Sequence, residues 1–324
     1  MKIALFGTGI YGLAIAKELA KKDNKIIMWS ESKEKVEEYN KTKKLASIYD
    51  TKIAKNIKVT NDIEETLLNT ELIFITCASK YVDSLTRSIK PYFKENMCVC
   101  IASKGIDDKK KDFLSNIVEN NLNTKNVSVI SGPTFAVDML NNAPIALALA
   151  ANNNKTKNMV LSTLSNDTLK LRPTRDLIGI QLCGTIKNCI AVASGILKGL
   201  GYPESTQIFL INESMHDIKK IIHLLGGKKK TILSFAGIGD LTLTCLSEKS
   251  RNFSFGYIIG STKSEKKINE YLENNTVEGY YAINLIYKML KKKKINIPLI
   301  DIIYDIVYKK EDPKSLIKFL IEKE

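Results

Sequence analysis

A single lysine stands inside an otherwise apolar stretch of the chain. From Ile178 to Leu197 the sequence reads IGIQLCGTIKNCIAVASGIL, and Lys187 carries its only charge. The apolar neighbours predict a buried helix. Burial disfavours the charged form of an amine and lowers its pKa. A lysine in such a place is suited to pass a proton near neutral pH.

The start of the chain has the pattern of a dinucleotide-binding turn. The segment KIALFGTGIYG places Gly7, Gly9 and Gly12 after an apolar run. In such a motif the first glycine permits a tight turn, the second lets the backbone approach a pyrophosphate, and the third lets helix and strand pack closely. A glycine turn in another kind of βαβ unit is the alternative. The alternating run LAIAKELA and a second apolar run ending at Trp29 favour the dinucleotide site.

An acidic residue follows the second predicted strand. Ser30 and Glu31 come about twenty residues after the glycines, where an acid accepts hydrogen bonds from a ribose 2′-hydroxyl and repels a 2′-phosphate. Glu31 therefore favours NAD over NADP. The alternative is an exposed loop glutamate, because the segment ESKEK is rich in charge.

The composition describes a basic globular protein. The 324 residues are 44% hydrophobic and carry a formal net charge of +14, which comes from dispersed lysines. The sequence lacks a patch of interleaved arginine and aromatic residues, so nucleic-acid binding is not predicted. A basic surface can still attract anionic substrates. Against 45 lysines there are only four arginines, a residue whose planar fork suits phosphate or carboxylate binding.

Cysteine and histidine indicate neither disulfides nor a metal. The cysteines lie in apolar runs, which is typical of small hydrophobic side chains in a reducing compartment. The sequence has no CxxC pair and no histidine cluster, so neither zinc nor another metal is predicted. His216 and His223 are interpreted as structural. No signal peptide is expected, and no run is apolar enough throughout to predict a membrane span. A cytoplasmic protein without an integral membrane segment is expected.

Two regions differ in their hydrophobic pattern. Residues 1–172 alternate strand-like and helical segments, which predicts an N-terminal Rossmann-like domain with a doubly wound parallel sheet. Residues 173–324 are helical throughout, so an all-α-helical substrate and catalytic domain is expected. The fold class is therefore α/β with a helical second domain. The expected strands are Lys2–Phe6, Lys25–Trp29, Glu71–Cys77, Met97–Ala102, Val127–Ser131 and Ile145–Ala150.

Four further segments combine turn residues with functional side chains. Lys104 stands in ASKG after a predicted strand, Thr134 stands in SGPTFA after the next one, Asp240 ends GIGD, and Arg251 is the centre of SRN. The carboxyl ends of parallel strands are where such sheets bind ligands. Each segment also has a structural interpretation, namely turn formation for the glycines and helix capping for Asp240 and Ser250.

These segments carry a resemblance to a known family. GTGIYG, ASKG, SGPTFA, GTIKNCIAVASGI, AGIGDLTLTCLSEKSRNFSFG and VEGYYA, in this order, resemble bacterial NAD(P)-dependent glycerol-3-phosphate dehydrogenase over essentially the whole chain. The resemblance implies reduction of dihydroxyacetone phosphate to sn-glycerol 3-phosphate for phospholipid synthesis. It also implies NAD or NADP as cofactor, no metal, a small phosphorylated substrate and a homodimer.

The resemblance also assigns roles to individual residues. Lys187 is expected to be the general acid/base, with Asn188 and Asp240 orienting it and the substrate. The expected substrate-binding residues are Lys104, Gly132, Thr134, Lys187, Asp240, Ser250, Arg251 and Asn252. The expected cofactor-binding residues are Gly7, Gly9, Ile10, Tyr11, Gly12, Glu31, Lys104, Ala136, Arg251 and Glu278.

One departure and two alternatives accompany this assignment. Bacterial members often carry a basic or imidazole side chain near the position that follows Trp29, whereas this chain has Ser30 and Glu31. Another two-domain dehydrogenase of a hydroxy acid would share the fold and a helical lysine, but would need a carboxylate-binding group in place of SRN. A non-catalytic dinucleotide sensor would bind the cofactor without turnover, and would have no need of proton-transfer residues.

Overall fold

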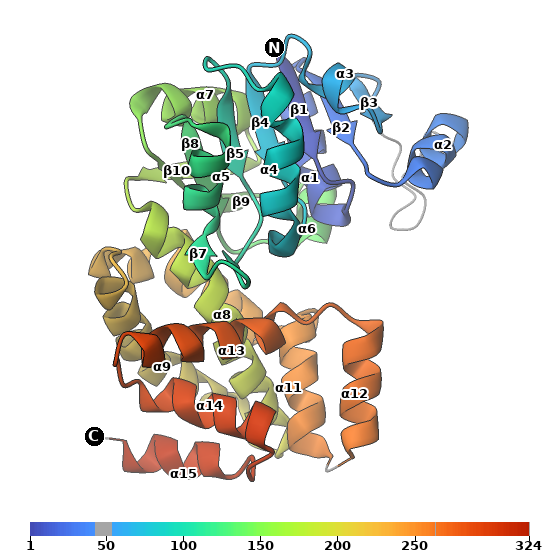
Figure 1. The fold of residues 1–324 in the computed structure, drawn as a ribbon. Helices are drawn as coiled ribbons and strands as arrows, with labels where there is room; N and C mark the ends of the chain where they lie inside the picture. The colour runs from blue at the N-terminus through green and yellow to red at the C-terminus, as the bar shows by residue number, and fades with distance from the viewer. Residues whose placement is uncertain (43–53, 263, 324) are drawn as a thin grey trace. The chain divides into compact units, whose positions relative to one another are not determined.

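The computed structural model describes residues 1–42, 54–262 and 264–323. The chain divides into two compact units (Figure 1). The first comprises Met1–Asp107 and Asp112–Leu177, and the second comprises Asp108–Lys111 and Ile178–Glu324. The strands belong to the first unit, and the second is built from helices.

The first unit contains a large sheet flanked by helices. Its strands are β1 (Lys2–Phe6), β2 (Lys25–Trp29), β3 (Ile57–Thr60), β4 (Leu72–Ile75), β5 (Cys98–Ile101), β6 (Ile106–Asp107), β7 (Asp112–Phe113), β8 (Val127–Ser131), β9 (Ile145–Ala151) and β10 (Leu169–Thr174). Its helices are α1 (Ile10–Ala20), α2 (Lys33–Thr42), α3 (Ile63–Leu67), η1 (Ser79–Tyr81), α4 (Val82–Ile89), η2 (Lys90–Tyr92), α5 (Leu114–Leu122), α6 (Ala136–Leu140) and α7 (Asn154–Leu164).

The eight-stranded sheet has the order β10-β9-β8-β5-β4-β1-β2-β3. Neighbouring strands from β8 to β3 are parallel, which confirms the predicted α/β class. One pair departs from this parallel arrangement, because β9 runs antiparallel to β8. The connection between β8 and β9 contains only the short helix α6, which packs on α1. A parallel neighbour would need a longer crossover, so β9 runs back beside β8 in the opposite direction.

Both faces of the sheet are buried, as the apolar strands predict. On one face Leu5, Met28 and Phe74 belong to a cluster that includes residues of α1, α6 and α7. The alternate residues, among them Ile27 and Ile73, are also buried. Successive side chains of a strand point to opposite faces, so helices or loops must cover both.

Strand β10 shows how local sequence and tertiary position combine. Pro173, which marks the change of pattern in the sequence, lies within this strand and not after it. Proline lacks a backbone donor, and it is tolerated here because β10 is the edge of the sheet. The strand ends at Thr174, and α8 begins at Leu177.

The second unit is built around one long buried helix. Every residue of α8 (Leu177–Gly199) from Gly179 to Leu197 is buried. The remaining elements are α9 (Glu204–Leu224), η3 (Lys229–Leu233), η4 (Phe235–Gly239), α10 (Asp240–Cys245), α11 (Arg251–Ser261), α12 (Glu265–Asn274), α13 (Glu278–Lys292), α14 (Pro298–Lys309) and α15 (Ser315–Glu322). By length and composition alone α8 could cross a membrane, but 89% of its apolar window is buried inside the protein.

Glycines let α8 and α11 approach each other closely. A Cβ atom added to Gly195 of α8 would lie 2.0 Å from the carbonyl oxygen of Phe253, and one added to Gly256 of α11 would lie 1.9 Å from that of Val192. Real Cβ atoms do not come so near, so only glycine fits at these crossings. This contact holds the start of α11 beside the middle of α8.

Candidate active site

The turn after β1 has the geometry that the glycine motif predicts. Gly7 has a φ of 125°, which favours glycine. A Cβ atom added to Gly12 would lie 2.3 Å from the carbonyl oxygen of Gly7, so α1 packs directly on the turn. A Cβ atom added to Gly9 would meet nothing within 4 Å, which leaves open space at the N-terminus of α1. An open helix N-terminus with free N–H groups is suited to bind a phosphate. Ile10 and Tyr11 form the first turn of this helix.

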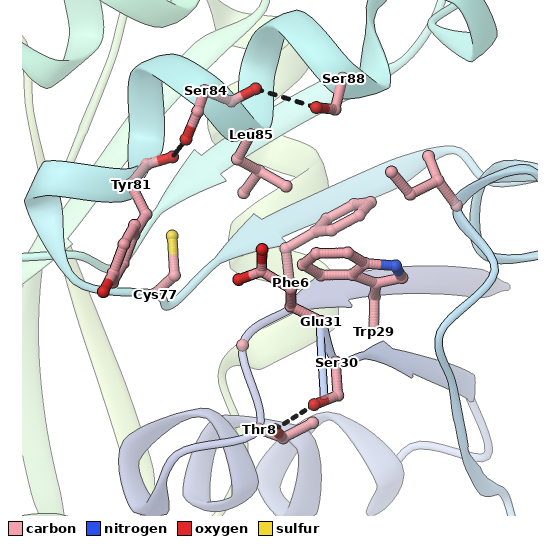
Figure 2. Close-up of a pocket in the computed structure, with 12 residues that line it drawn as sticks. Phe6, Thr8, Trp29, Ser30, Glu31, Cys77, Tyr81, Ser84, Leu85 and Ser88 are labelled. Atoms are coloured by element: carbon pink, nitrogen blue, oxygen red, sulfur yellow. Dashed lines mark hydrogen bonds between the residues drawn. The ribbon is translucent and has the colours of Figure 1, made fainter. Parts of the chain in front are cut away.

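A pocket of about 500 Å³ lies beside this turn. Figure 2 shows the Glu31 carboxylate pointing into the space between the Trp29 ring and helix α4. Of the described residues that line the pocket, only Glu31 is charged. A hydrogen bond of 3.2 Å from Thr8 Oγ1 to Ser30 Oγ lies next to it. The lining residues are Phe6, Gly7, Thr8, Trp29, Ser30, Glu31, Ile63, Cys77, Tyr81, Ser84, Leu85 and Ser88.

The two polar segments that follow β5 and β8 leave the same edge of the sheet, because these strands are parallel neighbours. Lys104 follows β5 and is half-buried. Gly132 and Thr134 follow β8 and are buried, and Ala136 is the first residue of α6. A Cβ atom added to Gly132 would lie 3.0 Å from the carbonyl oxygen of Ala146, so β9 limits this position to a small residue.

Lys187 is buried in α8, as the sequence predicts, and it is paired. Its Nζ atom lies 2.6 Å from Asp240 Oδ1 and 2.9 Å from Thr244 Oγ1. The exposed fractions are 6% for Lys187 and 1% for Asp240. The carboxylate stabilises the ammonium that burial alone would disfavour. The structure therefore holds the amine in one orientation, beside a carboxylate, in the interior of the helical unit.

The segment before α10 brings Asp240 to this lysine. A Cβ atom added to Gly237 would lie 2.1 Å from the carbonyl oxygen of Ile232, and the backbone of Gly237 is not helical. The tight turn delivers Asp240 as the first residue of α10. Thr244 follows one helical turn later and donates to the Asp240 carbonyl oxygen at 2.6 Å. Sequence reasoning missed Thr244, although its spacing of four residues from Asp240 on a helix is a usable signal.

Two asparagines form a second polar group, which includes Asn188, the residue that follows Lys187 in α8. Asn252 Nδ2 donates to Asn188 Oδ1 at 2.9 Å, and Asn188 Nδ2 donates to Glu278 Oε2 at 3.1 Å. The backbone N–H of Gly279 donates to Asn252 Oδ1 at 2.8 Å. These bonds join α8, α11 and the first turn of α13. Three predicted site residues, Asn188, Asn252 and Glu278, thus lie in one hydrogen-bonded group.

The start of α11 combines a cap with an exposed cation. Ser250 is the N-cap, and its Oγ atom accepts a hydrogen bond from the N–H of Phe253 at 3.3 Å. Arg251 begins the helix with an exposed side chain, and no carboxylate in the described part of the chain pairs with it. A guanidinium at a helix N-terminus can bind a phosphate without first breaking an ion pair.

The predicted site residues therefore divide between the two units. In the first unit, the glycine turn and Glu31 border one pocket, and Lys104, Gly132, Thr134 and Ala136 follow neighbouring strands. In the second unit, Lys187 meets Asp240, and Asn188 meets Asn252 and Glu278. Within the described residues, no group of three or more His, Cys, Asp or Glu side chains could hold a metal ion.

Comparison with known proteins identifies the family. The model of the NAD-dependent glycerol-3-phosphate dehydrogenase N-terminus matches residues 2–157, and that of its C-terminus matches residues 176–318. A glycerol-3-phosphate dehydrogenase (NAD(P)+) of Clostridium botulinum is 32% identical, with 100% of this chain and 98% of the relative covered. The corresponding protein of Staphylococcus haemolyticus is 29% identical, with 99% and 97% covered.

Solved structures agree with these sequence matches. The crystal structure of glycerol-3-phosphate dehydrogenase from Coxiella burnetii is 28% identical to this chain, covers 99% of each chain and has a TM-score of 0.92. Both family models and relatives of matching length thus cover the Rossmann-like and the helical units together. The chain belongs to the NAD-dependent glycerol-3-phosphate dehydrogenase family.

Proposed function

We propose that this protein interconverts dihydroxyacetone phosphate and sn-glycerol 3-phosphate with NAD(H) or NADP(H). The observation that supports this most is the buried Lys187, held by Asp240 and Thr244, in a member of this oxidoreductase family. Reduction of a ketone needs a proton donor beside the carbonyl oxygen. An oriented ammonium meets that need.

The nicotinamide dinucleotide supplies the hydride when it is bound. Lys187 Nζ donates a proton to the ketone oxygen as the carbonyl carbon is reduced, and it removes the hydroxyl proton in the reverse direction. Asp240 stabilises the ammonium before transfer and, with Thr244, holds Nζ in place. Both partners are on one short helix, so the direction of the N–H bonds is set before substrate arrives.

The phosphate of the substrate is assigned to the start of α11. Arg251 offers a fork of donors, Ser250 offers a hydroxyl, and Asn252 offers an amide N–H. Lys104, Gly132 and Thr134 are the proposed substrate contacts of the first unit. Binding energy at a remote phosphate positions the carbonyl for reaction.

The dinucleotide is assigned to the glycine turn and the pocket beside it. Gly7, Gly9 and Gly12 with Ile10 and Tyr11 would hold the pyrophosphate, and the open space at Gly9 supports this fit. Ala136, Lys104, Arg251 and Glu278 are the further proposed contacts. Among the described residues that line the pocket, Glu31 contributes a negative charge and none contributes a positive one, which favours NADH over NADPH.

The other two functions agree less well with the structure. A hydroxy-acid dehydrogenase is disfavoured by membership of the glycerol-3-phosphate dehydrogenase family. A non-catalytic sensor does not need a buried ion pair at Lys187. As finer points we propose a cytoplasmic homodimer, on the basis of the family resemblance, whose product supplies glycerophospholipid synthesis.

The reaction can be tested by the loss of nicotinamide absorbance. Purified protein is mixed with dihydroxyacetone phosphate and either NADH or NADPH, and with a 2-keto acid in parallel. Oxidation that requires the phosphoketone supports the proposal. Oxidation with the 2-keto acid alone supports the hydroxy-acid alternative, and cofactor binding without any oxidation supports the sensor.

A further inference from the structure

Asn188, Asn252 and the first turn of α13 form a closed ring of hydrogen bonds. The ring starts at the Gly279 N–H, passes through Asn252 and Asn188, and ends at the Glu278 carboxylate. Glu278 and Gly279 are consecutive, so the side chain of one residue and the backbone N–H of the next, both in α13, provide the two ends of the ring. Both asparagines are at least nine-tenths buried, with exposed fractions of 4% for Asn188 and 9% for Asn252.

The chemistry of the two ends fixes the direction of every bond in the ring. A backbone N–H can only donate, so Asn252 must turn its oxygen toward Gly279. Its Nδ2 group then faces Asn188, which must accept with Oδ1 and donate with Nδ2. A carboxylate can only accept, and Glu278 ends the series in the same direction. Neither amide can flip without placing two donors or two acceptors against each other.

Close packing holds the α13 turn in this position. A Cβ atom added to Gly279 would lie 2.7 Å from the Asn188 carbonyl oxygen and 3.0 Å from Asn252 Oδ1. On the other side of the turn, the Tyr308 hydroxyl donates to the Tyr280 carbonyl oxygen at 2.6 Å, and the two rings stack with centroids 4.8 Å apart. The donor and the acceptor of the turn are therefore presented at fixed positions.

We propose that Glu278 and Gly279 are positioning residues of the substrate site, which lock Asn188 and Asn252 in one orientation beside Lys187. This role rests on the proposed function and adds to the cofactor contact assigned to Glu278. One Nδ2 hydrogen of Asn252 is used in the ring, in the bond to Asn188 Oδ1. The second Nδ2 hydrogen is the donor that Asn252 offers to a substrate oxygen. An anionic oxygen, such as one of a phosphate, accepts from that hydrogen.

Two substitutions of Glu278 separate positioning from cofactor contact. Glu278→Gln keeps an acceptor of the same length for Asn188, whereas Glu278→Ala removes it. At saturating cofactor, we expect Glu278→Ala to lower kcat/KM for dihydroxyacetone phosphate by about 10- to 100-fold, and Glu278→Gln to restore most of it. Glu273→Ala, at an exposed glutamate of α12, is the matched control and should leave this value unchanged.

A change confined to the KM for the cofactor in Glu278→Ala would overturn the proposal. A second measurement does not depend on activity. Urea unfolding of Glu278→Ala, Asn252→Ala and the double variant should show non-additive midpoint shifts, because the two side chains are coupled through Asn188. Additive shifts would also overturn the positioning role of Glu278. If the shifts are non-additive but the wild-type protein does not reduce dihydroxyacetone phosphate, only the proposed reaction is overturned.

Discussion

The Lys187 ammonium and the Asp240 carboxylate form a buried ion pair with a separation of 2.6 Å, between residues 53 positions apart in the sequence. The sequence alone suggests an isolated amine in an apolar helix. The pair changes this interpretation, because the carboxylate accepts a hydrogen bond from the amine and fixes its orientation. Lys187 is thus prepared to act as a proton donor in ketone reduction.

Replacement of the lysine should separate chemistry from cofactor binding. Lys187→Met removes the proton donor but keeps a side chain of similar length. We expect kcat to fall by about 10²- to 10⁴-fold, while the Kd for NADH stays near its wild-type value. Steady-state kinetics and fluorescence titration with NADH measure the two quantities. Near-normal turnover in this variant would remove Lys187 from the mechanism.

The ion pair can also be tested through stability. Asp240→Asn leaves the Lys187 ammonium buried without its counter-charge, so we expect the free energy of unfolding to fall by about 3–5 kcal/mol. The double variant Lys187→Met/Asp240→Leu removes both charges and should be more stable than Asp240→Asn. Urea denaturation followed by circular dichroism compares them. Equal stability of Asp240→Asn and wild type would contradict a buried charged pair.

Arg251 should contribute mainly to substrate binding. Arg251→Lys keeps the positive charge but loses the planar fork, so we expect the KM for dihydroxyacetone phosphate to rise by about tenfold or more, with a smaller change in kcat. Arg87→Lys is a suitable control, because Arg87 is an exposed residue that pairs with Asp83 at 3.3 Å on α4. An unchanged KM in Arg251→Lys would argue against phosphate binding by this residue.

Glu31 should decide which dinucleotide is preferred. In Glu31→Ser the carboxylate that lines the pocket is lost, and a 2′-phosphate is no longer repelled. We expect the ratio of kcat/KM for NADPH to that for NADH to rise by about tenfold. Glu37→Ser makes the same charge change at an exposed position of α2 that does not line the pocket, and its ratio should stay constant. A similar rise in both variants would indicate a general charge effect.

The thiol of Cys77, which lines the same pocket, provides a pH-dependent test. Burial raises the pKa of Cys77 to about 11, so the reactive thiolate is scarce at pH 8 and accumulates only as the pH approaches that value. We expect alkylation by iodoacetamide to accelerate about tenfold per pH unit beyond pH 9 in the folded protein. A rate that levels off near pH 9, as for an ordinary thiol, would contradict this environment. Cys77→Ser identifies the reacting residue, and NADH should slow the reaction.

Local sequence was sufficient for the elements that follow one pattern. The glycine spacing of GTGIYG predicted the turn, because Gly7 needs a positive φ and Gly12 has no room for a side chain. Apolar runs predicted the main strands and the buried helix α8, because a segment covered on all sides contains few polar residues. The strand β3 was missed, since its four residues IKVT show too short a pattern.

The tertiary structure decided which side chains meet. Thr244 beside Lys187, the bond from Asn252 to Asn188 across 64 positions, and the bond from Asn188 to Glu278 across 90 positions depend on how α8, α10, α11 and α13 pack. The reversed direction of β9 likewise depends on where its short connection packs. The dinucleotide turn, the buried lysine and the helical second unit could all be predicted from local sequence patterns. Only the fold decided the lysine's partners and the orientation of the amides, because hydrogen bonds between distant segments have no local signature.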